Sequence, residues 1–174
     1  MASIQACGLP EDSLLRRYLD RGGYADCYVI ELERRVQHAE FVEAFYTTSV
    51  FKLERLVLSW FVARPSTDAE AQELARGHAT SFAAWNVEAR DHNQVLLSDF
   101  QGRTRSWLMI APGASSQSTR LFFGSAVVPT VDRRSGQRTM GFAFRALLGF
   151  HKLYSRVLLH AASRRLARSG ITAR

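Results

Sequence analysis

His151 and Tyr154 are the residues of this sequence whose types and spacing could do chemistry inside a fold. They lie three positions apart in the amphipathic segment Thr139 to Arg165, which is predicted to be a helix. At about 100° per residue, His151 falls among apolar side chains, and Tyr154 follows nearly one turn later. A buried histidine beside a phenol could transfer a proton or hold the polar group of a ligand.

A structural role for His151 is the alternative. A lone histidine on an apolar helix face usually forms a hydrogen bond with a neighbour and has no further function, because buried polar groups need partners. The sequence offers no second catalytic group opposite His151, since Asp99 falls on the other strand face from Arg105. The helix therefore favours a pocket over a reaction.

A second candidate wall is formed by alternating residues of one strand. Arg103, Arg105, Trp107 and Met109 share a face, so guanidinium groups could bind an anionic headgroup while Trp107 contacts an apolar tail. Alternatively, the arginines lie exposed at a hairpin end and only Trp107 and Met109 are buried, which we favour. Trp85, on a neighbouring predicted strand, is a further candidate for the wall.

The sequence contains no motif for zinc binding, phosphate binding or serine hydrolase chemistry. No two histidines have the spacing of a zinc site, no glycine-rich loop could hold phosphate, and no serine lies in a nucleophile elbow. We therefore predict no metal and no cofactor. Cys7 and Cys27 lack the spacing of a zinc or redox motif, so free thiols in a reducing cytosol are expected.

The net charge of +7 raises the possibility of nucleic-acid binding. Only Lys52 and Lys152 are lysines among 23 basic residues, and the arginines are scattered without interleaved aromatic residues. An arginine-rich solvated surface is the better interpretation, so no nucleic-acid partner is predicted. The amino terminus lacks the pattern of a signal peptide, and no window is apolar and long enough to span a membrane. A cytoplasmic protein is expected.

The order of elements begins with short helices and a strand. We expect a short helix at Glu11 to Arg21, a strand at Tyr24 to Leu32, and helical spacing from His38 to Ala63 that breaks at Thr47 to Ser49. Thr67 and Glu70 form a capping box for a polar helix that ends at Gly77. The ordered core of one domain, residues 1–174, is predicted over about 11–166.

Strands follow, and then the final helix. The hairpin Gln94 to Ala111 is predicted to turn at Gln101 and Gly102, which places Ser98 opposite Arg105 and Leu96 opposite Trp107. Thr119 to Pro129 is apolar on both faces and is expected to be a central strand. On the final helix we expect one arc to face the sheet and a polar stripe to face water: Arg145, Gly149, Lys152, Arg156, His160 and Ser163.

This order resembles the helix-grip fold of the START and birch-pollen-allergen superfamily (SRPBCC), and in particular its bacterial members. The segments that carry the resemblance are YADCYVIEL, HAEFVEAFYTTSVFKLERLVLSW, DFQGRTRSWLMIAP with TRLFFGSAVVP, and MGFAFRALLGFHKLYSRVLLHAA. The resemblance implies an α+β fold in which a curved antiparallel sheet wraps around a long carboxyl-terminal helix, with two shorter helices after the first strand. About five strands are evident, where fuller members have six or seven.

Members of this superfamily bind lipids, sterols, polyketides or plant hormones, and some are cyclases or dehydratases. The resemblance therefore implies non-catalytic binding of a hydrophobic or amphipathic small molecule in a cavity between sheet and final helix. The absence of a void above about 300 Å³ there would contradict this prediction. The candidate ligand-binding residues are His151, Tyr154, Arg105, Trp107 and Trp85. A cyclase or dehydratase that uses His151 or Tyr154, and a solid-core interaction module, are the alternatives.

Overall fold

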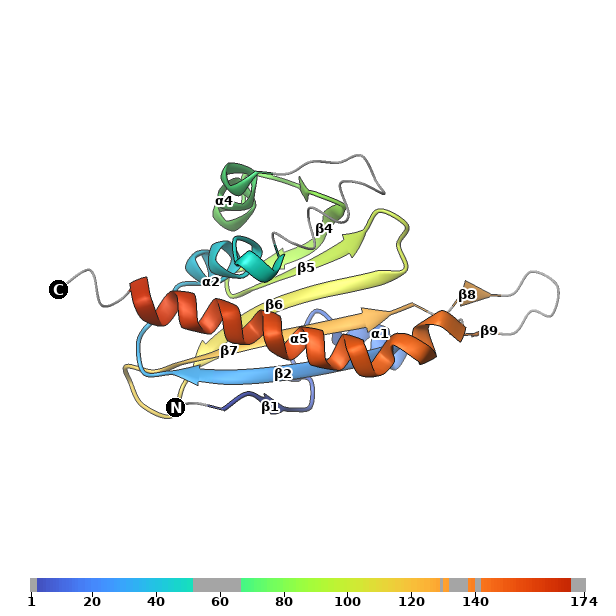
Figure 1. Ribbon diagram of the computed structural model, residues 1–174, viewed down its shortest axis with the longest axis horizontal. Helices are drawn as coiled ribbons and strands as arrows, with labels where there is room; N and C mark the ends of the chain where they lie inside the picture. The colour runs from blue at the N-terminus through green and yellow to red at the C-terminus, as the bar shows by residue number, and fades with distance from the viewer. Residues whose placement is uncertain (1–2, 52–66, 129, 132–137, 140–141, 170–174) are drawn as a thin grey trace.

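A curved antiparallel sheet of seven strands forms the centre of the molecule, in the order β1-β2-β7-β6-β5-β4-β3 (Figure 1). The computed structural model describes residues 3–51, 67–128, 130–131, 138–139 and 142–169, with side chains of the last helix described from residue 152. The strands are β1 (Gln5–Ala6), β2 (Tyr24–Leu32), β3 (Ser81–Phe82), β4 (Trp85–Asp91), β5 (Gln94–Asp99), β6 (Thr104–Pro112) and β7 (Thr119–Val127). A separate ribbon pairs β8 (Thr130–Val131) with β9 (Arg138–Thr139).

Helices lie on both sides of this sheet. The long helix α5 (Phe142–Ser169) crosses one face, and α2 (His38–Tyr46) and α4 (Asp68–Arg76) continue the same layer (Figure 1). The short helix α1 (Arg16–Asp20) and the chain before it pack on the opposite face. The architecture is therefore α+β, with a carboxyl-terminal helix against an antiparallel sheet, as the sequence predicted at this level.

Two apolar clusters, one on each face of the sheet, make up the core. On the α5 face, aromatic rings of α2 stack against the sheet, with Phe45 and Phe123 centroids 4.7 Å apart. On the other face, Trp107 packs with residues of α1, β2 and β7, including Leu15, Cys27 and Phe122. Both surfaces of the central strands are thus removed from water, which stabilises the fold in proportion to the apolar area buried.

Several predicted elements are confirmed. Strand β2 covers Tyr24–Leu32, and α2 ends at Tyr46, where the Thr47 hydroxyl donates to the Glu43 carbonyl across 2.6 Å. The capping box of α4 forms as predicted, and Gly77 ends that helix with φ of +86°. The predicted second helix after Ser49 lies mostly in 52–66, outside the described residues.

The hairpin of β5 and β6 has the predicted register, with Ser98 opposite Arg105 and Leu96 opposite Trp107. Its turn is longer than predicted, because the strands end at Asp99 and resume at Thr104. The Asp99 carboxylate accepts from the backbone amides of Arg103 and Thr104, at 2.6 and 2.9 Å, which closes the turn. Strand β7 lies between β2 and β6 and is central, as predicted.

Two expectations about the sheet and the amino-terminal segment are wrong. The sheet has seven strands rather than five, because β1 and β3 contain two residues each and leave no periodic signal. The ordered core does not begin at residue 11, since β1 pairs with β2. At the other end, Leu166 is the last buried residue of α5, close to the predicted boundary of about 166, and the helix continues to Ser169.

The polar stripe predicted on α5 is only partly correct. Lys152, Arg156 and His160 are exposed, whereas Ser163 is buried and its hydroxyl donates to the carbonyl of His160. The reason is a second contact surface: the carboxyl-terminal half of α5 also packs against α2, and Arg165 donates to the Thr47 carbonyl across 3.0 Å. A helix held on two sides buries a wider arc than a single-face wheel predicts.

Candidate functional site

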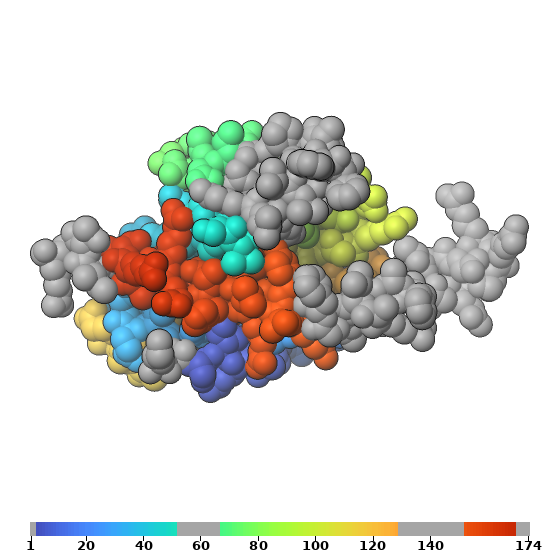
Figure 2. All heavy atoms as spheres, viewed as in Figure 1, coloured from blue at the N-terminus to red at the C-terminus, as the bar shows by residue number. Residues whose placement is uncertain are grey.

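A pocket of about 200 Å³ lies between the sheet and α5. Figure 2 shows α5, in orange and red, packed along this side of the molecule. The described lining comes from the end of α2, from Phe51 beyond it, from strands β4, β6 and β7, and from α5: Phe45, Phe51, Trp85, Thr104, Arg105, Ser106, Phe123, Ser125, Ala126, Val127, Tyr154, Ser155 and Leu158. The larger cavity of at least about 300 Å³ that we expected here is not found among the described residues.

Most polar side chains of this lining already have partners. The Ser106 hydroxyl lies 3.1 Å from the Tyr46 hydroxyl, and Ser125 donates to the Asp26 carboxylate across 2.6 Å. Tyr154, which is half-buried, also interacts with a neighbour. These groups fix the walls of the pocket and have little hydrogen-bonding capacity to offer a ligand.

Two buried polar atoms of the described lining have no hydrogen-bond partner. The indole nitrogen of Trp85 on β4 and the hydroxyl of Ser155 on α5 are both buried without a hydrogen bond. An indole N–H only donates, whereas a hydroxyl both donates and accepts. A buried polar group without a partner costs about 1 to 3 kcal/mol, so native proteins rarely keep one without a use. The residues that line the pocket therefore include one with an unused donor and one with an unused hydroxyl.

The pocket is electrically neutral over its described lining. It contains no Asp, Glu, Lys or His side chain there, and its one arginine, Arg105, directs its guanidinium elsewhere. Within this described lining an ionised ligand would find no counter-charge, which is strongly unfavourable. A neutral ligand fits this lining.

Arg105 is bound in a polar cluster on the face away from α5. Its Nε donates to the Tyr18 hydroxyl across 2.8 Å and to Glu88 across 2.5 Å, and its guanidinium stacks 4.6 Å over the Tyr18 ring. The Tyr18 hydroxyl donates in turn to Glu88, and burial together with that carboxylate raises the pKa of Tyr18. Arg105 thus joins α1 to β4 and β6, and its guanidinium is not placed to bind a ligand in the pocket.

Trp107 is also placed on the face away from α5. Its side chain is fully buried among residues of α1, β2 and β7, and its indole nitrogen donates to Gln94. The expected wall of Trp107 and Tyr154 across one cavity is therefore wrong. Side chains alternate across a strand, and α5 covers the face that carries Ser106 and Leu108 instead.

Of the other predicted site residues, Trp85 and Tyr154 both line the pocket. His151 lies in α5 one turn before Ser155, and its side chain is outside the described part of the chain. The sequence did not predict Ser155 as a site residue, because nothing in the pattern around it distinguishes a buried helical serine from an exposed one. Its only signal is its position one turn after His151.

The buried histidine that the structure does describe is His38, at the start of α2. Its ring is about nine-tenths buried, with Nε2 3.4 Å from the Leu108 carbonyl. Burial lowers its pKa to about 4, since the charged ring would lose its hydration there. His38 is not in the lining of the pocket, so we assign it a structural role.

Comparison of the chain with models of protein families, with curated proteins and with solved structures finds no match. The site must therefore be interpreted from its own geometry. Among the described residues, no cluster of three or more His, Cys, Asp or Glu side chains could hold a metal ion. None of the described helices combines the length and apolar character needed to cross a bilayer.

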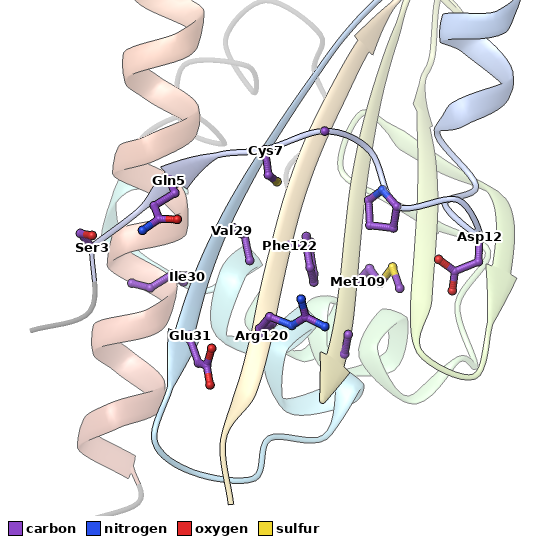
Figure 3. A pocket seen from close by; sticks show the side chains of 13 residues that line it. Ser3, Gln5, Cys7, Asp12, Val29, Ile30, Glu31, Met109, Arg120 and Phe122 are labelled. Atoms are coloured by element: carbon purple, nitrogen blue, oxygen red, sulfur yellow. The ribbon is translucent and has the colours of Figure 1, made fainter. Parts of the chain in front are cut away.

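A wider and more open groove lies on the opposite face of the sheet. The chain between β1 and α1 crosses the strands there, above Val29, Met109 and Phe122 (Figure 3). Its volume is about 720 Å³, and charged side chains at its rim include Asp12, Glu31 and Arg120. These charges are already used in part, since Arg120 donates to the Pro112 carbonyl and Glu31 accepts from Ser118.

Proposed function

We propose that the protein binds a small neutral molecule, without chemical change, in the pocket between the sheet and α5. The molecule would be a monocyclic or short-chain compound with one hydrogen-bond acceptor. The order of elements resembles the helix-grip fold, in which ligands occupy this position. The resemblance supports the location, and the lining of the pocket supports the class of ligand.

The observation that carries the proposal is the pair of unpartnered polar atoms, Trp85 Nε1 and Ser155 Oγ. They belong to residues of β4 and α5, so the sheet and the helix each contribute one such residue to the lining of the same pocket. A single acceptor oxygen on the ligand has two lone pairs, so it could accept from the indole N–H and from the hydroxyl. The cost of leaving these groups unpaired would then be recovered on binding.

The volume of the pocket and the side chains of its described lining limit the class of ligand further. An engineered apolar cavity of about 150 Å³ holds benzene, so a pocket of about 200 Å³ suits a single ring with a short substituent. Phe45, Phe51 and Phe123 supply aromatic surface for such a ring. No carboxylate or histidine occurs among the described lining side chains, so binding is proposed rather than cyclase or dehydratase chemistry.

The test uses three probes of similar shape: ethylbenzene, acetophenone and benzoate. Each is titrated into the ¹⁵N-labelled protein while the indole N–H resonances are followed by NMR. We expect acetophenone to shift the Trp85 signal saturably, because its carbonyl can accept from Nε1. Ethylbenzene should bind more weakly, and benzoate should not bind. The Trp107 indole, which is bonded to Gln94 on the other face, is an internal control.

Two variants separate specific binding from general apolar partition. Trp85→Phe keeps a ring but loses the donor, so its affinity for acetophenone should fall about 5- to 10-fold, the value of one hydrogen bond. The Trp107→Phe variant should bind as the native chain does. Equal binding of acetophenone and ethylbenzene, or no saturable shift at Trp85 with any probe, would overturn the proposal.

A further inference from the structure

Cys7 and Cys27 face each other across the sheet edge, although twenty positions separate them in the sequence. Their Sγ atoms are 3.2 Å apart, and the Cys7 amide donates to the Cys27 carbonyl across 3.0 Å. This contact continues the antiparallel register of β1 and β2, in which Gln5 lies opposite Val29 and Ala6 opposite Tyr28.

Such a pair meets the geometric requirement for a disulfide. Residues directly opposite in antiparallel strands have Cα atoms roughly 4.5 to 5.5 Å apart. That separation lies inside the range of about 4.4 to 6.8 Å that a disulfide tolerates. The two thiols could therefore be joined with little movement of the backbone. The sequence spacing gave no sign of this, because the fold alone places the two residues opposite each other.

The two thiols differ in access. Cys27 is buried on β2, whereas Cys7 is half-buried and lines open grooves on both sides of the sheet edge. Figure 3 shows Cys7 where the amino-terminal segment leaves β1 and starts across the strands. Hydrogen bonding to the Cys27 thiol lowers the pKa of Cys7, which favours its reactive thiolate. The hydrogen bond with Cys7, together with burial, raises the pKa of Cys27.

We propose that Cys7 and Cys27 form a reversible disulfide that locks the amino-terminal segment onto the sheet. The oxidant is a small disulfide of the glutathione class. The Cys7 thiolate attacks one sulfur of the oxidant, forms a mixed disulfide and releases one thiolate. The Cys27 thiol loses its proton, attacks Cys7 Sγ and releases the second thiolate. Two protein thiols are thereby oxidised, and one disulfide is reduced to two thiols.

The bond would change the segment that covers the Trp107 face. It closes a loop that contains α1 and the chain leading to it. In that chain the backbone of Asp12 and of Leu14 forms hydrogen bonds with the Gln94 side chain. Closing a loop of about twenty residues removes entropy mainly from the unfolded chain. The site lies outside the pocket against α5, so the inference stands independently of the proposed function.

To test this, the protein is incubated with mixtures of oxidised and reduced glutathione in which the ratio of the two forms is varied. After acid quenching and alkylation, digestion with trypsin is followed by mass spectrometry. We expect the peptides 1–16 and 22–34 to become cross-linked, with loss of two hydrogen atoms. Adding dithiothreitol should reverse the link. The oxidised form should melt about 5 to 10 °C higher, and amide exchange over residues 6–12 should slow at least about tenfold.

Cys7→Ser is the matched control, because Cys7 is only half-buried and serine preserves its shape. This variant should show no cross-link and no shift in Tm between oxidising and reducing buffers. A stable mixed disulfide at Cys7 in the native chain, or a link between two chains, would overturn the inference. The same conclusion would follow if the thiols stay free at every glutathione ratio, or if the linked form melts no higher than the reduced form.

Discussion

The indole nitrogen of Trp107 donates a hydrogen bond to the side-chain oxygen of Gln94 on the neighbouring strand, across 2.9 Å. Both side chains are buried. The same amide oxygen accepts from the backbone of Leu14, and its nitrogen donates to the carbonyl of Asp12, both at 3.0 Å. One glutamine therefore holds the amino-terminal segment against the sheet and satisfies the largest fully buried side chain among the described residues.

Gln94→Ala should lower the free energy of unfolding by about 3 kcal/mol. It removes these contacts and leaves the Trp107 N–H buried without an acceptor, which costs more than the hydrogen bond itself contributes. Urea unfolding followed by tryptophan fluorescence measures the change. The exposed Gln101→Ala serves as the control and should stay within about 0.5 kcal/mol of the native chain. A Gln94→Ala midpoint equal to that control would show that the segment is held by other contacts.

Gly124→Ala should destabilise the protein by about 2 kcal/mol. A Cβ at this position of β7 would lie 2.9 Å from side-chain atoms of Leu15 and Trp107 and from the Asp26 carbonyl, closer than packed atoms allow. Gly8→Ala is the matched control, since no atom lies within 4 Å of its added Cβ. Thermal unfolding of the two variants should separate them by several degrees. Equal melting temperatures would mean that the sheet opens readily at Gly124.

The stability of the protein should fall as the pH drops below about 6.5, partly because of His38. Its folded pKa of about 4 lies below the ordinary value of 6.5, so the unfolded chain binds the proton more readily across this interval. The neutral ring therefore favours folding fully above pH 6.5, and that contribution declines toward pH 4. Between pH 7 and pH 5 the loss from this group should be about 2 kcal/mol.

Urea titrations at the two pH values test this, with His38→Gln as the variant. Glutamine retains a donor for the Leu108 carbonyl but does not titrate. Between pH 7 and pH 5 the variant should therefore lose about 2 kcal/mol less of its free energy of unfolding than the native chain does. His160→Gln, on the exposed side of α5, is the control and should keep the native slope. If the His38 variant retains that slope as well, the group responsible lies elsewhere.

Ser155→Ala should stabilise the ligand-free protein by about 1 kcal/mol while weakening its affinity for acetophenone. The substitution removes a buried hydroxyl that has no partner, so the folded state loses a cost and no contact. Ser106→Ala is the matched comparison, because it removes a hydroxyl bonded to Tyr46 and should destabilise by a similar amount. Calorimetry of both variants measures whether each one is more or less stable than the native chain. A destabilised Ser155→Ala would mean that the hydroxyl is satisfied in solution.

Local signals in the sequence predicted much of the fold. The Thr67 and Glu70 capping box, the break of the helix at Thr47 and the pairing of Leu96 with Trp107 depend on neighbouring residues or on a short turn, and all three are confirmed. Such features need no knowledge of distant parts of the chain.

The placement of the site residues required long-range information. Strand β6 is apolar on both faces, with Trp107 and Met109 on one and Leu108 and Ile110 on the other, so alternation could not show which face α5 covers. The segment before α1 has no periodic pattern, yet it packs over the face of the sheet that carries Trp107. It is held there by the hydrogen bond of Gln94 to Asp12 and by the contact of Cys7 with Cys27. Ser155 became a candidate only when its lack of a partner was visible.

The two-residue strands β1 and β3 have a consequence for how this protein behaves among copies of itself. They are the outermost strands of the seven-stranded sheet, and each offers few backbone groups with which another molecule could extend it. Next to β3, the register of β4 shifts between Val87 and Ala89, a bulge that twists the strand away from a flat edge. Short edge strands and a shift of register beside the edge are both features that disfavour edge-to-edge pairing of sheets.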